Sequence, residues 1–253
     1  MVQTFDLRKS FRDGRRGEVV AVGGVSFHAM PGQIFGLLGV NGAGKTTTLR
    51  MLSTVVRPSG GTARVAGFDV LEHPQRVRAS IGFMSTSTAL YGRLSAREMI
   101  EYFGSLYGLG GKALKSRVNE IVDRLQIGEF SHRLCDKLST GQRQRVSIAR
   151  TILHDPPVLF FDEPTAGLDV RLSQTVMEFI EDARNDGKTI LLSTHIMSEA
   201  ERLCDEVAII HDGVLQAHGT VAKLKEQAGE SSFERAFLKL IDFQSEYRPG
   251  ASA

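Results

Sequence analysis

The sequence has no tryptophan and only two cysteines among its 253 residues. Cys135 and Cys204 lie far apart and outside any close pairing pattern, which argues against a disulfide framework and against a zinc site. We expect both side chains to pack as small buried hydrophobic groups, in a protein of the reducing cytoplasm.

Long apolar runs are missing as well. The most apolar segments, residues 157–161 and 189–192, are far shorter than the ~20 residues that a membrane-spanning helix needs. The N-terminus is charged from the sixth residue onward, so it lacks the apolar core of a signal peptide. We expect a chain without an export signal and without a membrane span of its own.

Excess charge of one sign is also small, since the formal net charge is +2. Composition therefore neither implies nor excludes a nucleic-acid partner. With 42% hydrophobic residues, a chain of this length can bury a full core. We expect one domain that can carry a subdomain.

The pattern of apolar residues changes along the chain. Residues 19–39 alternate apolar and polar around glycine turns, which predicts strands, and a turn at 58–61 leads into a short strand at 63–65. Residues 94–134 show apolar spacings of three and four, which predict a helical subdomain. Beyond residue 157, short strands alternate with helical stretches, which is typical of an α/β fold with a mostly parallel sheet. The strands expected there are 158–161, 190–193 and 207–210.

One glycine-rich segment, GVNGAGKTTTLR at residues 39–50, follows an apolar stretch at 34–38 and leads into a predicted helix at 48–56. It fits the pattern G-x-x-x-x-G-K-[ST] of the phosphate-binding loop. The alternative, a glycine turn with an incidental lysine, is disfavoured by the full spacing between a strand and a helix. The residues assigned to nucleotide binding are Gly39, Asn41, Gly42, Ala43, Gly44, Lys45, Thr46 and Thr47.

The chemistry of this loop depends on its backbone and on two side chains. Glycines let successive N–H groups point at an anion, and the following helix adds the positive end of its dipole. Lys45 is expected to reach the β- and γ-phosphates, and the Thr46 hydroxyl is expected to join a Mg²⁺ shell.

The segment PVLFFDEP at residues 157–164 supplies two carboxylates directly after an apolar run. Asp162 is predicted to hold Mg²⁺, and Glu163 is predicted to orient or deprotonate an attacking water. A solvated strand end is the alternative for this pair, and the four apolar residues before it disfavour that alternative.

The segment LSTGQRQRVSIAR at residues 138–150 resembles the L-S-G-G-Q signature of the ATP-binding cassette (ABC) ATPases. Ser139, Gly141 and Gln142 stand at the start of a predicted helix, where free N–H groups and a hydroxyl can bind an anion. The resemblance implies that this anion is the γ-phosphate held by the other subunit. A helix that is merely capped by Ser139 is the alternative.

Three further segments resemble the same family. TAGLD carries Asp169 and resembles the D-loop, and LLSTHIMSEAERLCDEVAIIHDG carries His195 and resembles the switch region. The resemblance implies that His195 senses the γ-phosphate and steadies Glu163. LRKSFRDGRRGEVVAV resembles the adenine-stacking loop, with Phe11 in the aromatic position and Val22 nearby.

The resemblance covers roughly residues 2–222 and implies a P-loop NTPase core with a mostly parallel sheet, an N-terminal antiparallel β subdomain and an inserted α-helical subdomain at about 86–152. Residues 1–222 are expected to form the ATPase domain, and 223–253 a short C-terminal helical extension. ATP and Mg²⁺ are the implied cofactors. Two chains, as a homodimer or with a paired ATPase subunit, are expected to sandwich two ATP molecules beneath a separate transmembrane permease. The expected location is the cytoplasm, peripheral on the inner face of the cell membrane, with no nucleic-acid partner.

Two positions depart from the family pattern. Thr140 replaces the first glycine of the signature, which is costly only if that position needs a positive φ. Thr86 replaces the glutamine of the Q-loop, which normally touches Mg²⁺ and the attacking water, and the segment beyond it contacts the membrane partner. The Ser/Thr-rich form of this segment, together with the signature's STG, resembles the sodium-export (NatA-type) group of bacterial exporters.

Two other functions share these motifs. A soluble ABC ATPase that acts on nucleic acid or the ribosome usually carries two cassettes or a long coiled coil, and this chain shows neither. An importer ATPase is the third interpretation. The Ser/Thr-rich segment disfavours it, as does FERAFLKL at residues 233–240, which is similar to the endings of exporter ATPases or is an amphipathic helix on the core.

Overall fold

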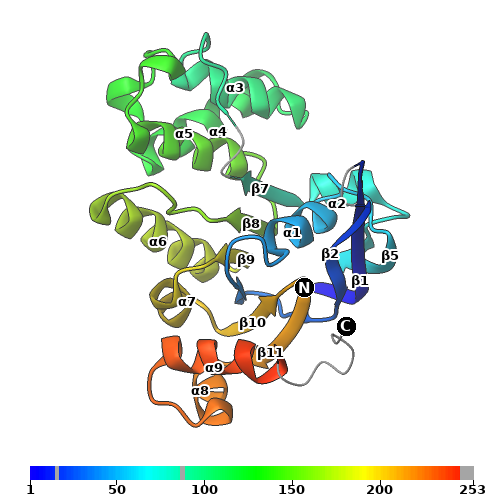
Figure 1. The fold of residues 1–253 in the computed structure, drawn as a ribbon. Helices are drawn as coiled ribbons and strands as arrows, with labels where there is room; N and C mark the ends of the chain where they lie inside the picture. Colours follow the sequence, from blue (N-terminus) through cyan, green and yellow to red (C-terminus); the bar gives the residue numbers. More distant parts are fainter. Residues whose placement is uncertain (15–16, 86–88, 246–253) are drawn as a thin grey trace.

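The structure, a computed structural model, describes residues 1–14, 17–85 and 89–245. In this part of the chain the strands form two sheets, and a group of helices stands beyond β7 at the edge of the larger one (Figure 1). The strands of the first sheet are β1 (Val2–Asp13), β2 (Gly17–Val25), β3 (His28–Ala29), β5 (Gly60–Val65) and β6 (Phe68–Asp69). Those of the second are β4 (Ile34–Leu38), β7 (Ile81–Ser85), β8 (Val158–Asp162), β9 (Thr189–Thr194), β10 (Glu206–His211) and β11 (Val214–Gly219).

The first sheet is antiparallel, in the order β2-β1-β5-β6, with β3 also paired to β1. Its long strand β1 changes register against β5 between Phe5 and Arg8, where Asp6 has a φ of +48°. Val2 and Leu7, on either side of this irregularity, are fully buried. The predicted N-terminal antiparallel β subdomain is confirmed.

The second sheet has the order β11-β10-β4-β9-β8-β7, and every neighbouring pair is parallel except β10 with β11. Strands β4, β8 and β9 are buried along their whole length, as expected for parallel strands covered on both faces. Their carboxyl ends therefore meet at one edge of the sheet, where ligands bind in open α/β folds. The predicted α/β fold with a mostly parallel sheet is confirmed.

Helices follow most strands of the described chain. They are α1 (Lys45–Leu52), α2 (Pro74–Ala79), α3 (Ala96–Leu106), α4 (Gly111–Arg124), α5 (Thr140–Ile152), α6 (Val170–Asn185), α7 (Met197–Leu203), α8 (Val221–Ala228) and α9 (Phe233–Ser245). Figure 1 shows α3, α4 and α5 together, in green, apart from the helices that cover the sheet. This group falls within the range of about 86–152 predicted for the helical subdomain, whose boundaries remain a prediction.

The last two helices pack together and onto the β10–β11 side of the second sheet (Figure 1). Phe233 and Phe237 of α9 are 2% and 1% exposed, so the segment FERAFLKL forms an amphipathic helix on the core. Helix α8 begins at Val221, two residues before the expected start of the C-terminal extension.

Other expectations from the sequence concern the helix after the glycine-rich loop, the two cysteines, Thr86 and membrane-spanning helices. The helix predicted at 48–56 forms as α1, earlier in the chain: it starts at Lys45, directly after its N-cap Gly44, and ends at Leu52, before Thr54 adopts a φ of +61°. Cys135 is buried and Cys204 is partly buried. Thr86 lies outside the described residues. Within the residues that are described, no helix is long and apolar enough to cross a bilayer.

Candidate functional site

The glycine-rich loop connects β4 to α1, and two of its glycines are dictated by their surroundings. A Cβ on Gly39 would lie 2.2 Å from the carbonyl oxygen of Ile210, so no larger residue fits there. Gly44 has a φ of +106°, and a Cβ on it would lie 2.6 Å from the Ala21 oxygen. The loop is thus pressed against the sheet on one side, while the amides at the start of α1 carry the positive end of the helix dipole.

Lys45 is the first residue of α1 and is only 4% exposed. Its Nζ donates hydrogen bonds to the Gly39 oxygen at 2.8 Å and the Val40 oxygen at 3.1 Å, and lies 3.5 Å from Glu163 Oε1. Burial lowers the pKa of Lys45, and the carboxylates of Glu163 and Asp162 oppose that shift. The loop therefore holds a desolvated cation beside two carboxylates, an arrangement suited to binding anionic phosphates.

Thr46 and Asp162 meet at the end of β8. The Thr46 hydroxyl donates to Asp162 Oδ1 at 3.0 Å, and Asp162 is 2% exposed. A hydroxyl and a carboxylate are hard oxygen ligands of the kind Mg²⁺ prefers. Among the described residues no group of three or more His, Cys, Asp or Glu side chains could hold a metal alone. The pair therefore fits a Mg²⁺ ion whose shell is completed by phosphate oxygens and water.

Glu163 and His195 face each other across the ends of β8 and β9. His195 Nδ1 lies 3.2 Å from Glu163 Oε1, and the two side chains are 41% and 21% exposed. Glu163 has a φ of +50°, a conformation that costs a non-glycine residue about 1–2 kcal/mol. A hydrogen bond of 2.9 Å from its N–H to the Ser193 oxygen holds this conformation. Backbone strain at a charged, half-open position is a feature of functional sites.

The signature residues form a second group at the N-terminus of α5. Ser139 and Gln142 make a reciprocal capping box: the Ser139 hydroxyl accepts from the Gln142 N–H at 3.3 Å, and Gln142 Oε1 accepts from the Ser139 N–H at 3.0 Å. The capping interpretation is therefore part of the structure. Thr140 is the first helical residue and has no positive φ, so threonine is tolerated where the family has glycine.

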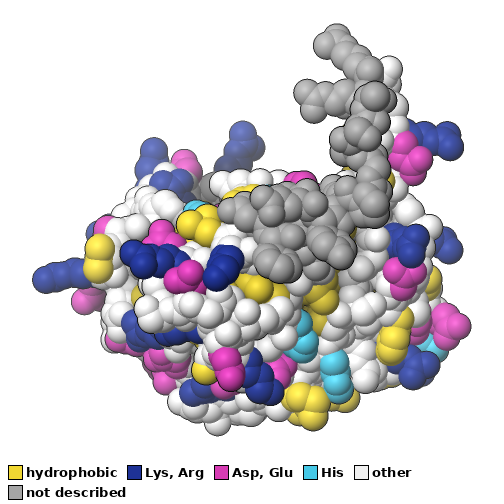
Figure 2. Space-filling model, turned by 60° about the horizontal axis from the view of Figure 1, so that its bottom comes forward, with side chains coloured by type: hydrophobic (Ala, Val, Ile, Leu, Met, Phe, Trp, Pro, Cys, Tyr) yellow, Lys and Arg dark blue, Asp and Glu magenta, His cyan; other side chains and the backbone are white. Residues whose placement is uncertain are grey.

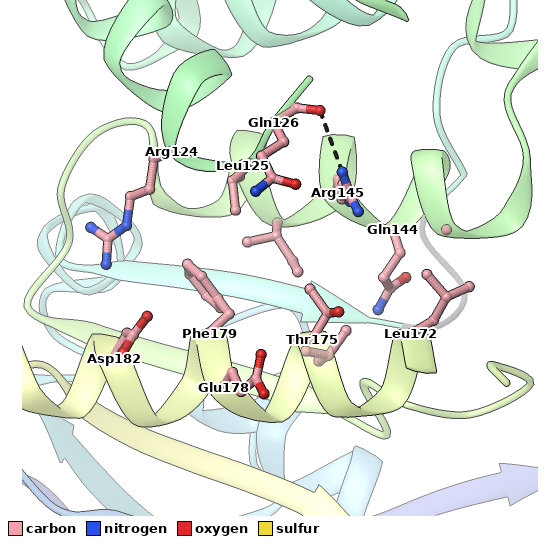
Figure 3. A pocket seen from close by; sticks show the side chains of 13 residues that line it. Arg124, Leu125, Gln126, Gln144, Arg145, Leu172, Thr175, Glu178, Phe179 and Asp182 are labelled. Atoms are coloured by element: carbon pink, nitrogen blue, oxygen red, sulfur yellow. Dashed lines mark hydrogen bonds between the residues drawn. The ribbon is translucent and has the colours of Figure 1, made fainter. Parts of the chain in front are cut away.

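Asp169 and Gly141 are linked through α6. Asp169 caps α6 by accepting a hydrogen bond of 3.0 Å from the Leu172 N–H. A Cβ on Gly141 would lie 2.5 Å from Leu172 Cδ2, so the glycine lets α5 and α6 approach closely. Beside this contact lies a groove of about 260 Å³ between α5, α6 and the end of α4, toward which Gln144 and Arg145 project (Figure 3). The D-loop and the signature thus meet through one leucine.

Phe11 lies on β1 and Val22 on β2. Phe11 pairs with Val19 and is 43% exposed, with Lys9 Nζ 5.0 Å from its ring centre. Its exposed face leaves the stacking role a prediction. Val22 is fully buried, and its Cγ2 would lie 3.4 Å from a Cβ on Gly44. In this structure Val22 therefore packs against the phosphate-binding loop at Gly44.

Gln144, which was not predicted from the sequence, ties the signature helix to the segment after the carboxylate strand. Gln144 Nε2 donates a hydrogen bond of 2.6 Å to the oxygen of Pro164, the residue after Glu163. Its signal was its position three residues after Gly141, on the face of α5 that meets α6. The asparagine and small residues of the loop, Asn41, Gly42, Ala43 and Thr47, lie in the loop or at the start of α1 as expected.

Comparisons with known proteins agree with this geometry. A sequence model of the ABC transporter family matches residues 22–166, and a second model, an AAA domain, matches residues 135–201. The ABC transporter ATP-binding protein NatA of Bacillus subtilis (strain 168) is 39% identical, over 95% of this chain and 98% of its own. The daunorubicin/doxorubicin resistance ATP-binding protein DrrA of Streptomyces peucetius is 38% identical, over 96% of this chain and 72% of its own.

Solved structures give the same result. An ATP-binding subunit of an ABC transporter superposes with a TM-score of 0.84 at 27% identity, over 95% of this chain and 99% of that one. The dimeric cassette MJ0796, in a post-hydrolysis state with ADP and Pi, shares the fold with a TM-score of 0.80 at 24% identity, over 87% of this chain and 98% of its own. The loop, the carboxylate strand and the signature helix lie within the matched residues, and the chain belongs to the ABC transporter family as one of its ATP-binding, ATP-hydrolysing subunits.

Proposed function

We propose that this chain is the energy-coupling subunit of an exporter, in which two ATPase chains bind two ATP molecules between them and drive a separate transmembrane permease. One observation carries the proposal. Direct contacts join the first group of residues at one edge of the sheet: Lys45 with Glu163, Glu163 with His195, and Thr46 with Asp162. At the start of α5, a second group consists of Ser139 and Gln142, which hydrogen-bond to each other. The second group is an anion-binding helix end that is available to ATP held by another chain.

Each contact suggests a role in hydrolysis. The loop amides and Lys45 bind the phosphates, and Thr46 with Asp162 holds Mg²⁺. Bound Mg²⁺ neutralises charge that develops on the phosphate oxygens. Glu163 orients and deprotonates the attacking water, and His195, whose Nδ1 lies 3.2 Å from Glu163 Oε1, steadies that carboxylate. The strained backbone of Glu163 fixes its carboxylate beside the γ-phosphate position before ATP binds.

In this proposal, closure of the two ATPase chains around ATP drives the conformational change of the permease. A full switch from an open to a closed pair needs roughly 5.5 kcal/mol of differential ATP affinity. In the proposed clamp this difference arises because the signature end adds its N–H groups and hydroxyl to the γ-phosphate only in the closed state. Hydrolysis removes that contact and resets the pair.

A patch of exposed aromatic side chains offers a contact for the permease. The exposed fractions are 53% for Tyr91, which precedes α3, 43% and 63% for Tyr102 and Leu106 on α3, and 42% for Tyr107, which directly follows it. The Tyr91 ring packs edge-on to Tyr102 at 5.7 Å. Clustered aromatic groups of this kind are enriched at protein interfaces. The patch follows the Thr86 segment in sequence, as expected for a surface that meets the membrane partner.

The signature helix α5 contacts the aromatic patch through Phe103 of α3. Arg150 of α5 is 5% exposed and lies 5.4 Å from the ring centre of Phe103, which packs on Tyr102 at 5.6 Å. A displacement of α5 on ATP binding would therefore move the aromatic patch. This supplies a route from the clamp to the permease.

The relatives support a direction and a cargo for the proposed transport. DrrA is named as a daunorubicin/doxorubicin resistance ATP-binding protein, which supports export. Sodium is the first cargo to test, because the Ser/Thr-rich segment and the identity to NatA point to that group. The proposed location is the cytoplasm, against the inner face of the cell membrane.

The alternative functions find less support. On the face shown in Figure 2, basic and acidic side chains are interspersed, without the single-sign stripe expected for a surface that binds nucleic acid. An importer ATPase would share every contact of the ATP site. Only the permease separates an importer from an exporter.

The test is affinity purification of tagged Glu163→Gln protein with ATP from gently solubilised host membranes. We expect one polytopic membrane protein at near-equal stoichiometry, whose pore can then be assayed for sodium flux. Tyr102→Glu is the matched control: it places a charge on the aromatic patch and is expected to lose the membrane protein while it retains ATP. Recovery of ribosomal proteins or nucleic acid in place of a membrane protein would overturn the exporter proposal.

A further inference from the structure

Glu199 is a buried carboxylate that the ATP site itself does not use. It lies in the first turn of α7 and is 7% exposed. The Thr165 hydroxyl donates a hydrogen bond to its Oε1, and the Thr194 hydroxyl donates one of 2.8 Å to its Oε2. Both threonines are buried as well, at 6% and 1% exposed. Each carboxylate oxygen is thus bound to a different threonine.

The two threonines belong to the two segments that carry the proposed catalytic groups. Thr165 stands two residues after Glu163, in the connection from β8 to α6, and Thr194 ends β9 directly before His195. The Thr194 hydroxyl also accepts a hydrogen bond of 3.0 Å from the Ile196 N–H, so it links the residues directly before and after His195. Glu199 therefore joins the backbone near Glu163 to the backbone near His195.

The strength of this bridge follows from its burial. A buried carboxylate without partners is costly, and hydroxyl donors to a charged oxygen form the stronger class of hydrogen bond. Glu199 also benefits from the positive N-terminal end of α7. The ladder of β8 and β9 holds the two segments together as far as the pair of Asp162 and Ser193, and the hydrogen bond of 2.9 Å from the Glu163 N–H to the Ser193 oxygen continues it by one residue. Glu199 adds a side-chain contact beyond this ladder, to Thr165 after β8 and to Thr194 at the end of β9.

We propose that Glu199 is a positioning residue for ATP hydrolysis: by binding Thr165 and Thr194 together, it maintains the placement of Glu163 and His195, whose Oε1 and Nδ1 atoms lie 3.2 Å apart. This inference rests on the proposed roles of Glu163 and His195. In this proposal Glu199 acts through Thr165 and Thr194, whose hydroxyls it binds, rather than on the reacting atoms. Its loss lets the two catalytic side chains drift apart while the phosphate-binding loop stays in place.

The test measures steady-state ATP hydrolysis by Glu199→Ala and Glu199→Gln. We expect Glu199→Ala to lower kcat about tenfold or more with a change in KM for ATP of less than about twofold, since the lost hydrogen bonds involve a charged group and act on orientation. Glu199→Gln keeps the shape and one acceptor, so its loss is smaller. Glu201→Gln is the matched control on the same helix, because Glu201 is exposed and pairs with Lys225 at 3.2 Å.

A second pair of variants keeps the test decisive if Glu199→Ala fails to fold. Thr165→Ser retains the hydroxyl and is expected to keep wild-type kcat, whereas Thr165→Val removes it and is expected to lose activity as Glu199→Gln does. A purely structural role would instead lower the thermal midpoint of Thr165→Val while leaving the kcat of its folded fraction unchanged.

Combination with His195→Ala shows whether Glu199 acts through the catalytic pair. If it does, Glu199→Ala costs little further activity in the His195→Ala background, so the two losses are less than additive. Additive losses, or an unchanged kcat in Glu199→Ala, would overturn the inference. Glu163→Gln is assayed beside these variants: if it hydrolyses ATP normally, the proposed roles fail first, and if it is inactive while Glu199→Ala is normal, only the positioning role fails.

Discussion

The two halves of the proposed ATP clamp differ in how they are held. At the loop edge, Lys45 and Asp162 are 4% and 2% exposed and are bound through several elements of the sheet. At the signature end, Ser139 is exposed and its side-chain partner, Gln142, is three residues away on the same helix. The loop half is organised by tertiary packing, whereas the signature half is organised by a local capping box.

This difference shows what each half needs. A site fixed by buried contacts from several strands can bind phosphate within one chain. A helix end that satisfies its own N–H groups can exchange those local bonds for a ligand at small cost, since a cap contributes only about 1 kcal/mol. The signature half is therefore suited to engage ATP late, when a second chain presents it.

The largest expected effect is at the loop half. Lys45→Ala removes the buried cation that is proposed to bind the phosphates, and we expect ATP hydrolysis to fall about 100-fold or more, as for the loss of one electrostatic contact to a transition state. Burial already lowers the pKa of Lys45, so the folded protein gains little from this charge and its thermal midpoint is expected to change little. Lys112→Ala, at an exposed lysine of α4, is the control. Hydrolysis by Lys45→Ala at the wild-type rate would refute the phosphate role of the loop.

The signature half gives a smaller and more selective effect. Aspartate caps a helix as well as serine, so Ser139→Asp is expected to change the free energy of unfolding by less than about 0.5 kcal/mol. The new carboxylate would repel the γ-phosphate of ATP on the second chain, and we expect turnover to fall about tenfold or more. Thr220→Asp makes a similar change at the cap of α8 and is expected to keep full activity. If Ser139→Asp hydrolyses ATP normally, capping is the only role of Ser139.

The smallest effect concerns the packing behind the signature helix. His154 follows α5 and stacks on Tyr107 with ring centres 3.6 Å apart, and burial lowers its pKa. The unfolded chain therefore binds a proton more readily than the folded one, so the stabilisation is complete above the unfolded pKa of about 6.5 and is lost as the pH falls below it. His154→Phe keeps the stacked ring and is expected to remove this part of the acid sensitivity. Urea unfolding at pH 7.5 and 5.5 measures it, and an equal loss in both proteins would contradict the assignment.

Most of the loop half could be predicted from the sequence because its chemistry is local. The spacing from Gly39 to Thr46 and the carboxylates after four apolar residues each lie within one short segment. The relation between segments was harder to predict. Glu199 is five residues from Thr194 but 34 from Thr165, and the only signal of this bridge is an acidic residue on the apolar stripe of α7.

The first sheet shows the same limit. The bulge at Asp6 interrupts the alternation of β1, so this long strand was not anticipated, and Phe11 lies on it in place of a free loop. The β10–β11 hairpin had a visible signal in Asp212-Gly213, where both residues adopt positive φ. Helix α1 was placed three residues too late because the phosphate-binding loop starts its helix at the lysine.

The most direct test of the composite clamp is the mass of Glu163→Gln in saturating ATP and Mg²⁺, measured by light scattering. Because this variant is expected to bind ATP and to hydrolyse it poorly, we expect a dimer with ATP and a monomer without it. The double variant Lys45→Ala/Glu163→Gln, which lacks the phosphate contact, is expected to stay monomeric in both conditions. A monomeric Glu163→Gln protein in saturating ATP would contradict the claim that the loop of one chain and the signature of another hold the same nucleotide.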